Sequence, residues 1–232
     1  MIDIRPFDTL GAANHGWLNA RHHFSFANYF DEARMGFGNL RVWNDDEIAA
    51  QSGFPQHPHR DMEIITYVRE GAITHKDNLG NEGRTEAGDV QVMSAGSGIA
   101  HSEYNMEDEK TRIFQIWIEP RSKGGEPRWG AKPFPKDDRT GNWTILASGL
   151  DEDRDALMIR ADAQVAGIAL KEGETASWTL KEGRKAYLVA ATGSMMVGGE
   201  FANERDGVAI EDIETIEIKA LEDTEIVLVD TI

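Results

Sequence analysis

The chain is divided into short strand-like runs separated by turn residues, and this pattern limits the fold more than any other feature. The runs are rich in Val, Ile, Tyr, Thr and Trp, which favour β-strands. Phrases such as REGAI, LGNEG and EAGDV lie between them and are typical of tight turns. Many short strands with frequent turns predict an all-β barrel or sandwich. The clearest runs are 62–68, 90–95, 112–119, 143–148, 186–191 and 225–230.

Internal similarity suggests two such units. Residues 67–90 and 187–209 each run strand, turn glycine, strand, loop and strand, which we interpret as a duplicated β-barrel. Helical signals are scarce, and DDEIAAQ at 45–51 could form one or two turns. The segment 131–142 concentrates Pro, Gly and charge and is the best linker candidate. The expected organisation is a first barrel at 1–130, a linker at 131–142 and a second barrel at 143–232.

Composition excludes several classes of function. The 232 residues include no cysteine, so thiol nucleophiles, disulfide frameworks, iron–sulfur clusters and zinc ribbons are ruled out. The formal net charge is -17 and both halves are acidic, which disfavours direct binding of nucleic acid or anionic membranes. Most acidic side chains lie in expected turns, where they favour solubility. MIDIRPFDTL lacks a signal-peptide core, and no apolar run approaches the ~20 residues that span a bilayer. We expect a cytoplasmic protein.

The seven histidines are confined to the first half, and His101 is the last of them. In a duplicated barrel, imidazole chemistry would therefore belong to the first copy. His57 and His59 are two residues apart, so on an extended strand they face the same side, about 6.6 Å apart. His101 and Glu103 follow the same spacing behind a Gly-rich turn. Two strands that meet across a barrel could bring all four side chains to one point.

Three imidazoles and one carboxylate suit a borderline divalent ion. An octahedral ion would keep two open positions for a substrate oxygen and dioxygen, whereas a tetrahedral zinc would be closed and structural. Ligand type leaves Fe, Mn, Co, Ni, Cu and Zn open. A lone HxH pair is also common among ordinary strand residues, so the second pair carries much of this prediction.

The remaining histidines have simpler interpretations. His75 lies in THKDNLG, which we expect to form a solvated hairpin. His15, His22 and His23 belong to the aromatic segment GWLNARHHFSFANYF, which is expected to pack over the barrel with one of these rings hydrogen-bonded. His22 and Trp17 are also candidates for the wall of a pocket.

Two motifs carry a resemblance to a known family. GSG before His101 lets the backbone bend sharply and lies within MSAGSGIAHSEYN. This run, together with HPHRDMEIITYV, HHFSFANYFD, GFGNLRVWNDD and FQIWI, resembles the pirin family of the cupin superfamily. The likeness extends to bacterial pirin-like proteins described as quercetin 2,3-dioxygenases. The quoted cupin motifs are Gly53-x3-His57-x-His59-x3-Glu63-x7-Gly71 and Gly88-Asp89 through Gly96-x-Gly98-x2-His101-x3-Asn105.

The resemblance implies a bicupin, two stacked jelly-roll barrels with one divalent metal in the first, Fe(II) ahead of Cu, Ni, Co, Mn or Zn. The second barrel would pack against the first and cover its mouth or edge. The pirin ligands fall on His57, His59, His101 and Glu103. The broader cupin pattern would use Glu63, but a regular strand carries Glu63 about 13 Å beyond His59. We therefore expect Glu103 as ligand and Glu63 as a residue that could orient a ligand imidazole.

The function implied by the resemblance is oxidative opening of the central ring of a flavonol such as quercetin, with O2 consumed and carbon monoxide released. Glu103 would be the general base that accepts the 3-hydroxyl proton. Two alternatives stay open. One is an iron-dependent redox sensor that binds a protein partner. The other is a cupin enzyme acting on another small enol or acid.

Overall fold

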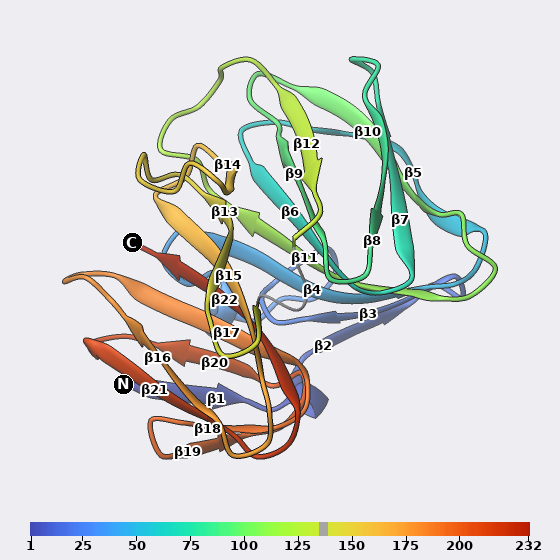
Figure 1. The fold of residues 1–232 in the computed structure, drawn as a ribbon. Coiled ribbons are helices and arrows are strands. Elements are labelled where there is room, and N and C mark those ends of the chain that lie inside the picture. The colour runs from blue at the N-terminus through green and yellow to red at the C-terminus, as the bar shows by residue number, and fades with distance from the viewer. Residues whose placement is uncertain (135–138) are drawn as a thin grey trace.

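The computed structural model describes residues 1–134 and 139–232 and is almost entirely β-structure (Figure 1). Two 3-10 helices, η1 (Phe7–Thr9) and η2 (Glu32–Arg34), are the helical elements of these ranges. No helix in the described part of the chain is long and apolar enough to span a bilayer. The all-β prediction is confirmed.

The first barrel is made of two sheets. Its seven-stranded sheet has the order β12 (Arg128–Lys132), β9 (Val90–Ser94), β6 (Glu63–Glu70), β11 (Thr111–Ile118), β4 (Leu40–Ile48), β3 (Leu18–His22) and β2 (Gly11–Asn14). Its four-stranded sheet has the order β5 (Ser52–His59), β10 (Ile99–Asn105), β7 (Ala72–Asp77) and β8 (Glu82–Glu86).

The second barrel repeats this plan. Its seven-stranded sheet has the order β1 (Ile2–Arg5), β20 (Gly207–Ile210), β17 (Lys185–Thr192), β22 (Thr224–Thr231), β15 (Ala163–Leu170), β13 (Thr144–Ser148) and β14 (Leu157–Met158). Its four-stranded sheet has the order β16 (Thr175–Thr179), β21 (Thr215–Ala220), β18 (Met195–Val197) and β19 (Glu200–Ala202).

The internal similarity read from the sequence corresponds to equivalent strands. In each barrel one strand of the large sheet, β6 or β17, turns into a hairpin of the small sheet and returns as β9 or β20. The turn glycines match, because Gly71 and Gly193 both have φ near +75°. Each lies against the hydroxyl of a threonine that begins a neighbouring strand of the large sheet, Thr111 of β11 or Thr224 of β22. The two β-barrels therefore share the order of their central strands and differ at the edges of the large sheets, where β3–β2 is antiparallel and β13–β14 is parallel.

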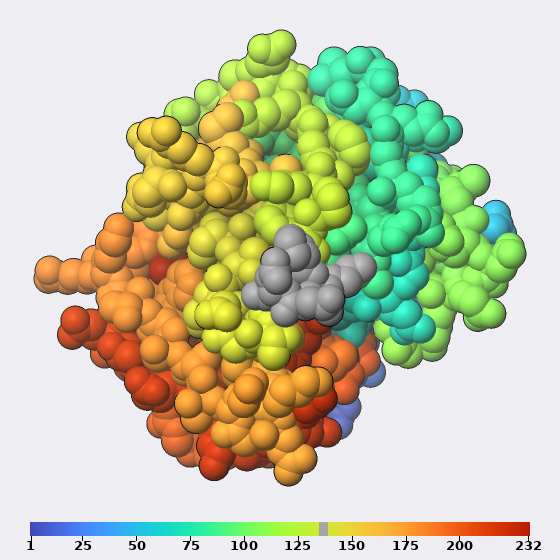
Figure 2. All heavy atoms as spheres, viewed as in Figure 1, coloured from blue at the N-terminus to red at the C-terminus, as the bar shows by residue number. Residues whose placement is uncertain are grey.

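The two large sheets pack face to face. Trp43, Tyr67 and Phe114 from the first barrel and Tyr187 and Val229 from the second belong to one buried cluster. In space-filling view the two halves of the chain form a single body with a broad shared boundary (Figure 2). This apolar junction joins the two barrels through their large sheets.

Two sequence expectations differ from the structure. Residues 45–48 continue β4 and do not form a helical turn, because they pair with β3 on one side and β11 on the other. Asp45 there is buried and paired with Arg69 and Arg205. Residues 2–5, expected in the first barrel, pair as β1 with β20, because Ile2 and Ile4 pack on the second barrel's core.

The linker expectation at 131–142 falls on a mixed segment. Ala131 and Lys132 are the last residues of β12, and Thr140 bridges to Ala169 of β15. Residues 135–138 of that segment lie outside the described residues.

Candidate metal centre

Three histidines meet where β5 and β10 pair. His101 lies opposite His57, and Ile99 lies opposite His59, so the register sets the three imidazoles side by side. Their ligand nitrogens all lie within 4.8 Å of one another. The ring centroids are 4.5 to 4.9 Å apart. The spacing argument from the sequence thus brought together the three histidines it named.

Hydrogen bonds behind the cluster show which nitrogens face its centre. The Nδ1 atom of His57 is 2.7 Å from the carbonyl oxygen of Pro55, an acceptor, so Nδ1 carries the proton. His57 Nε2 and His101 Nε2 then face each other at 3.1 Å. Two ligands at ~2.1 Å from one ion and at right angles are about 3.0 Å apart. The donor set and its spacing therefore fit a divalent ion.

Burial keeps these rings in the form that binds metals. Burial, and then the neighbouring imidazoles, lower the pKa of His59 to about 4 and that of His101 to about 3. At neutral pH both rings are unprotonated, and an unprotonated imidazole is the ligand form.

Glu103 is buried on the same strand as His101, but the cluster in the described residues does not extend to it. Its oxygens accept hydrogen bonds from Gln91 Nε2 and Gln115 Nε2, both at 2.7 Å, and from Thr66 Oγ1 at 3.1 Å. A register shift in the β5–β10 pairing separates His101 from Glu103. Ligation by Glu103 stays a prediction.

Glu63 does not face the cluster. The chain changes sheets between His59 at the end of β5 and Glu63 at the start of β6, so the two residues do not lie on one regular strand. Glu63 accepts a hydrogen bond from Ser94, and among the described residues no hydrogen bond joins it to an imidazole. Burial, opposed by the bond from Ser94, raises its pKa. The expected role in orienting a ligand finds no contact to support it.

An aromatic series leads away from His59. Trp117 meets His59 edge-on at 5.0 Å, and Phe26 meets Trp117 at 5.4 Å. His22, 5.3 Å from Phe26, is hydrogen-bonded to Asn44 at 2.9 Å. His22 is thus connected to His59 through Phe26 and Trp117, and its role in a pocket wall stays a prediction.

Trp17 is more remote from the histidines. It packs on Phe54 at 5.0 Å, and Phe54 in turn lies 6.3 Å from His57. An opening of about 390 Å³ beside the cluster is lined by His59, Arg60, Asn78 and residues 98–100 at the start of β10.

Two buried polar residues escaped the sequence analysis. His75, expected in a solvated hairpin, is fully buried, hydrogen-bonded to Asp77 and stacked on Trp129 at 4.9 Å. Ile73 and His75 alternate along β7 with the same burial, and this alternation was the available signal. Asp46 is the other residue, and its Oδ1 has no hydrogen-bond partner among the described residues. Burial, and then Asp45 and Glu103, raise the pKa of Asp46 well above its usual value.

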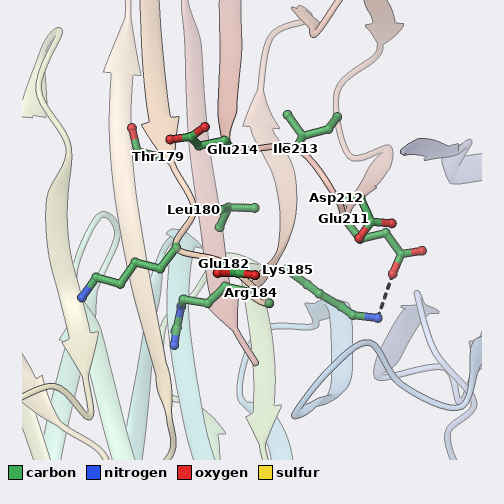
Figure 3. Close-up of a pocket in the computed structure, with 11 residues that line it drawn as sticks. Thr179, Leu180, Glu182, Arg184, Lys185, Glu211, Asp212, Ile213 and Glu214 are labelled. Carbon is green, nitrogen blue, oxygen red and sulfur yellow. Dashed lines mark hydrogen bonds and ion pairs between the residues drawn. The ribbon is translucent and has the colours of Figure 1, made fainter.

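A larger hollow of about 720 Å³ lies in the second barrel, between the β16–β17 and β20–β21 loops (Figure 3). Its basic side chains are already engaged: Lys185 pairs with Glu211, and Arg184 pairs with Asp162 and Asp230. No histidine lines it. The larger hollow is therefore distinct from the candidate metal centre.

Comparison with known proteins agrees with this architecture. Residues 4–118 match the family model described as Pirin, and residues 145–231 match the Quercetinase C-terminal cupin domain. The chain is 65% identical to the Pirin-like protein of Caulobacter vibrioides, over 99% of both chains. It is 42% identical to the Quercetin 2,3-dioxygenase of Escherichia coli K12, over 99% of this chain and 98% of that one.

A solved structure is similarly close. The crystal structure of the bacterial pirin YhhW from Escherichia coli in complex with nickel(II) has a TM-score of 0.94 and 40% identity, and it covers 100% of this chain and 99% of that chain. The sequence matches and the shared fold together show that the chain belongs to the pirin family, with two cupin domains.

Proposed function

We propose that the chain is a metal-dependent dioxygenase of the quercetinase type, which opens the central ring of a flavonol with O2 and releases carbon monoxide. The observation that carries the proposal is the cluster of His57, His59 and His101, whose ligand nitrogens lie within 4.8 Å of one another beside an opening. The relative named quercetin 2,3-dioxygenase and the nickel complex of YhhW support it.

The three histidines would hold the metal, with Glu103 as the fourth ligand. We take Fe(II) as the first candidate, and the nickel complex of YhhW makes Ni(II) the next to test. When bound, a divalent ion supplies Lewis acidity toward the flavonol oxygens and access to O2 chemistry.

Glu103 would accept the proton of the flavonol 3-hydroxyl. Gln91 and Thr66 donate to one of its oxygens and Gln115 donates to the other, so the carboxylate is oriented from both sides. A general base must be held within hydrogen-bond reach of the proton that it removes. These donors would hold Glu103 in place while a flavonol enters.

The aromatic series beside His59 would contact the flavonol rings. Trp117 and Phe26 offer flat apolar surfaces next to the histidines. Aromatic faces and edges favour contact with other rings, and they exclude water from the reacting atoms.

The test is aerobic turnover of quercetin by protein loaded with Fe(II), Ni(II), Co(II) or Cu(II). We expect the quercetin absorbance to fall and carbon monoxide to be released in air, and neither change to occur under anaerobic conditions. Glu103→Gln should lower kcat by about 10²–10⁴-fold if it removes a general base. Failure of the wild-type protein to consume quercetin with any of these metals would refute the proposal.

A further inference from the structure

A buried chain of polar contacts lies behind His101. The Nδ1 atom of His101 is 3.3 Å from Nδ1 of His75, and Nε2 of His75 is 3.0 Å from Oδ2 of Asp77. The side chains of His75 and Asp77 are fully buried, and His101 is 1% exposed. All three lie on the paired strands β7 and β10, where His101 is opposite Asp77 and Glu103 is opposite His75.

The proton positions on His75 and His101 follow from the carboxylate of Asp77 at the end of this series of contacts. A carboxylate only accepts hydrogen bonds, so the Nε2 atom of His75 carries the hydrogen that faces Asp77. A neutral imidazole has a single N–H, so Nδ1 of His75 is an acceptor and Nδ1–H of His101 donates to it. The Nε2 atom of His101 is then left with a free lone pair, and this is the atom that faces His57 Nε2.

We propose that Asp77 and His75 are positioning residues that hold His101 in the tautomer needed for metal binding. The inference rests on the metal site of the proposed function, but it concerns the affinity of that site and not the reaction. Residues that hydrogen-bond a ligand imidazole fix its tautomer and orientation, and their loss typically weakens metal binding by about 10- to 100-fold.

The positions of both residues are set independently of any metal. The backbone N–H groups of Leu79 and Asn81 and the side-chain amide of Asn81 donate to Asp77. Trp129 stacks on the ring of His75 with an interplanar angle of 11°. Trp129 can approach because Gly83 has no side chain: a Cβ there would lie 2.2 Å from the indole. The chain of contacts is therefore held rigidly on both sides.

Two variants test the proton arrangement. Asp77→Asn keeps the shape but can present an amide N–H to His75, which reverses the hydrogen-bond direction and places a proton on Nε2 of His101. His75→Phe keeps a ring against Trp129 but removes the acceptor. We expect each to raise the dissociation constant for Co(II) by about 10- to 100-fold, measured by competition with a chromophoric chelator.

Controls separate this role from general support of the turn. Asn81→Ala removes one of three donors to Asp77 but leaves the carboxylate as an acceptor for His75, so it should weaken Co(II) binding less than Asp77→Asn does. His75→Gln offers an amide oxygen toward His101 and should recover part of the affinity that His75→Phe loses. Denaturant unfolding of each metal-free variant shows whether the fold is retained.

A direct readout does not depend on catalysis. Long-range ¹H–¹⁵N spectra of the metal-free protein report which nitrogen of each histidine carries the proton. We expect the Nδ1–H form of His101 in the wild type and the Nε2–H form in Asp77→Asn. Equal Co(II) affinity and the same His101 tautomer in both proteins would overturn the inference, and so would equal losses in Asp77→Asn and Asn81→Ala. If the wild type binds Co(II) but leaves quercetin intact, only the proposed reaction fails.

Discussion

The two barrels share the order of their central strands, but equivalent positions in their interiors hold polar side chains in the first barrel and apolar side chains in the second. Counted from Gly71 and Gly193, the strand register sets His101 equivalent to Ile216 and Glu103 equivalent to Ile218. His75 is likewise equivalent to Val197. His57 lies opposite His101 and Trp178 lies opposite Ile216, so His57 and Trp178 are also equivalent. Ile216, Ile218 and Val197 belong to the buried core of the second barrel.

This difference separates the requirements of the fold from those of the site. The second barrel fills its centre with Ile, Val, Leu and Ala, which need no partners beyond van der Waals contact. The first barrel also has an apolar cluster that includes Ile48, Ile73 and Ile113. At the positions equivalent to Ile216, Ile218 and Val197, however, it places imidazoles and a carboxyl group, each of which needs a hydrogen-bond partner when buried. One scaffold thus supports a stabilising copy and a copy with chemistry.

The largest effects are expected when the equivalent residues His101 and Ile216 are each replaced by alanine. His101→Ala should abolish stoichiometric binding of Ni(II) or Co(II), because it removes one of three clustered ligands. Ile216→Ala should leave metal stoichiometry intact and lower the free energy of unfolding by about 2–5 kcal/mol through the cavity it creates. Metal analysis and urea unfolding of both variants decide the outcome. Equal metal binding by His101→Ala and wild type would remove the distinction between the barrels.

The junction between the barrels should be the next most sensitive region. Asp45 of β4 is fully buried and pairs with Arg69 of the first barrel and Arg205 of the second. Asp45→Asn should destabilise the protein by about 3–5 kcal/mol, because it leaves buried Arg69 without its counter-ion. Arg205→Gln should cost less, because Arg205 is 26% exposed and the Asp45–Arg69 pair remains. Chemical denaturation measures both, and a larger effect from Arg205→Gln would contradict this ranking.

The junction also predicts sensitivity to acid. His23 is hydrogen-bonded to Tyr187 of the second barrel at 2.9 Å. Burial, and then the charges of Arg5 and Arg34, lower the pKa of His23 well below its usual value. The unfolded chain binds a proton on this ring below about pH 6.5 and the folded chain does not, so stability falls as pH drops through that range.

The contribution of His23 to that slope is at most about 1.4 kcal/mol per pH unit. His23→Gln should flatten the fall in unfolding free energy between pH 7 and pH 5, measured in urea. Parallel pH profiles for variant and wild type would show that His23 contributes nothing to the acid response.

The turn glycines should be required in both barrels. Gly71→Ala and Gly193→Ala each place a side chain at φ near +75°, with Cβ about 2.6 Å from Thr111 Oγ1 and 2.5 Å from Thr224 Oγ1. The conformation alone costs about 1–2 kcal/mol at each position. Thermal or urea unfolding should show a loss for both variants, larger for Gly193→Ala, because its Cβ would also lie 2.6 Å from the carbonyl oxygen of Asp223. A loss confined to one barrel would break the equivalence of the turns.

Local sequence patterns were sufficient to predict many of the strands. Strand runs with β-branched and aromatic residues identified β6, β9, β11, β13, β17 and β22, because period-two alternation and turn glycines act within a few residues. The same reasoning failed at 45–51, where one or two helical turns were expected but residues 45–48 continue β4. Asp45 is buried because arginines distant in the sequence neutralise it.

By itself, the sequence determined the all-β class and the duplication, which follow from strand and turn patterns. It also predicted that His57, His59 and His101 converge, from the histidine spacing on two separate strands, and the three rings do lie together. Only the tertiary structure decided that Glu63 faces away from the histidines, that β1 joins the second barrel, and that His75 and Asp77 lie behind His101. Those outcomes depend on which strands pair across the barrels. Pairing between distant segments is set by packing of the whole core, which no local pattern contains.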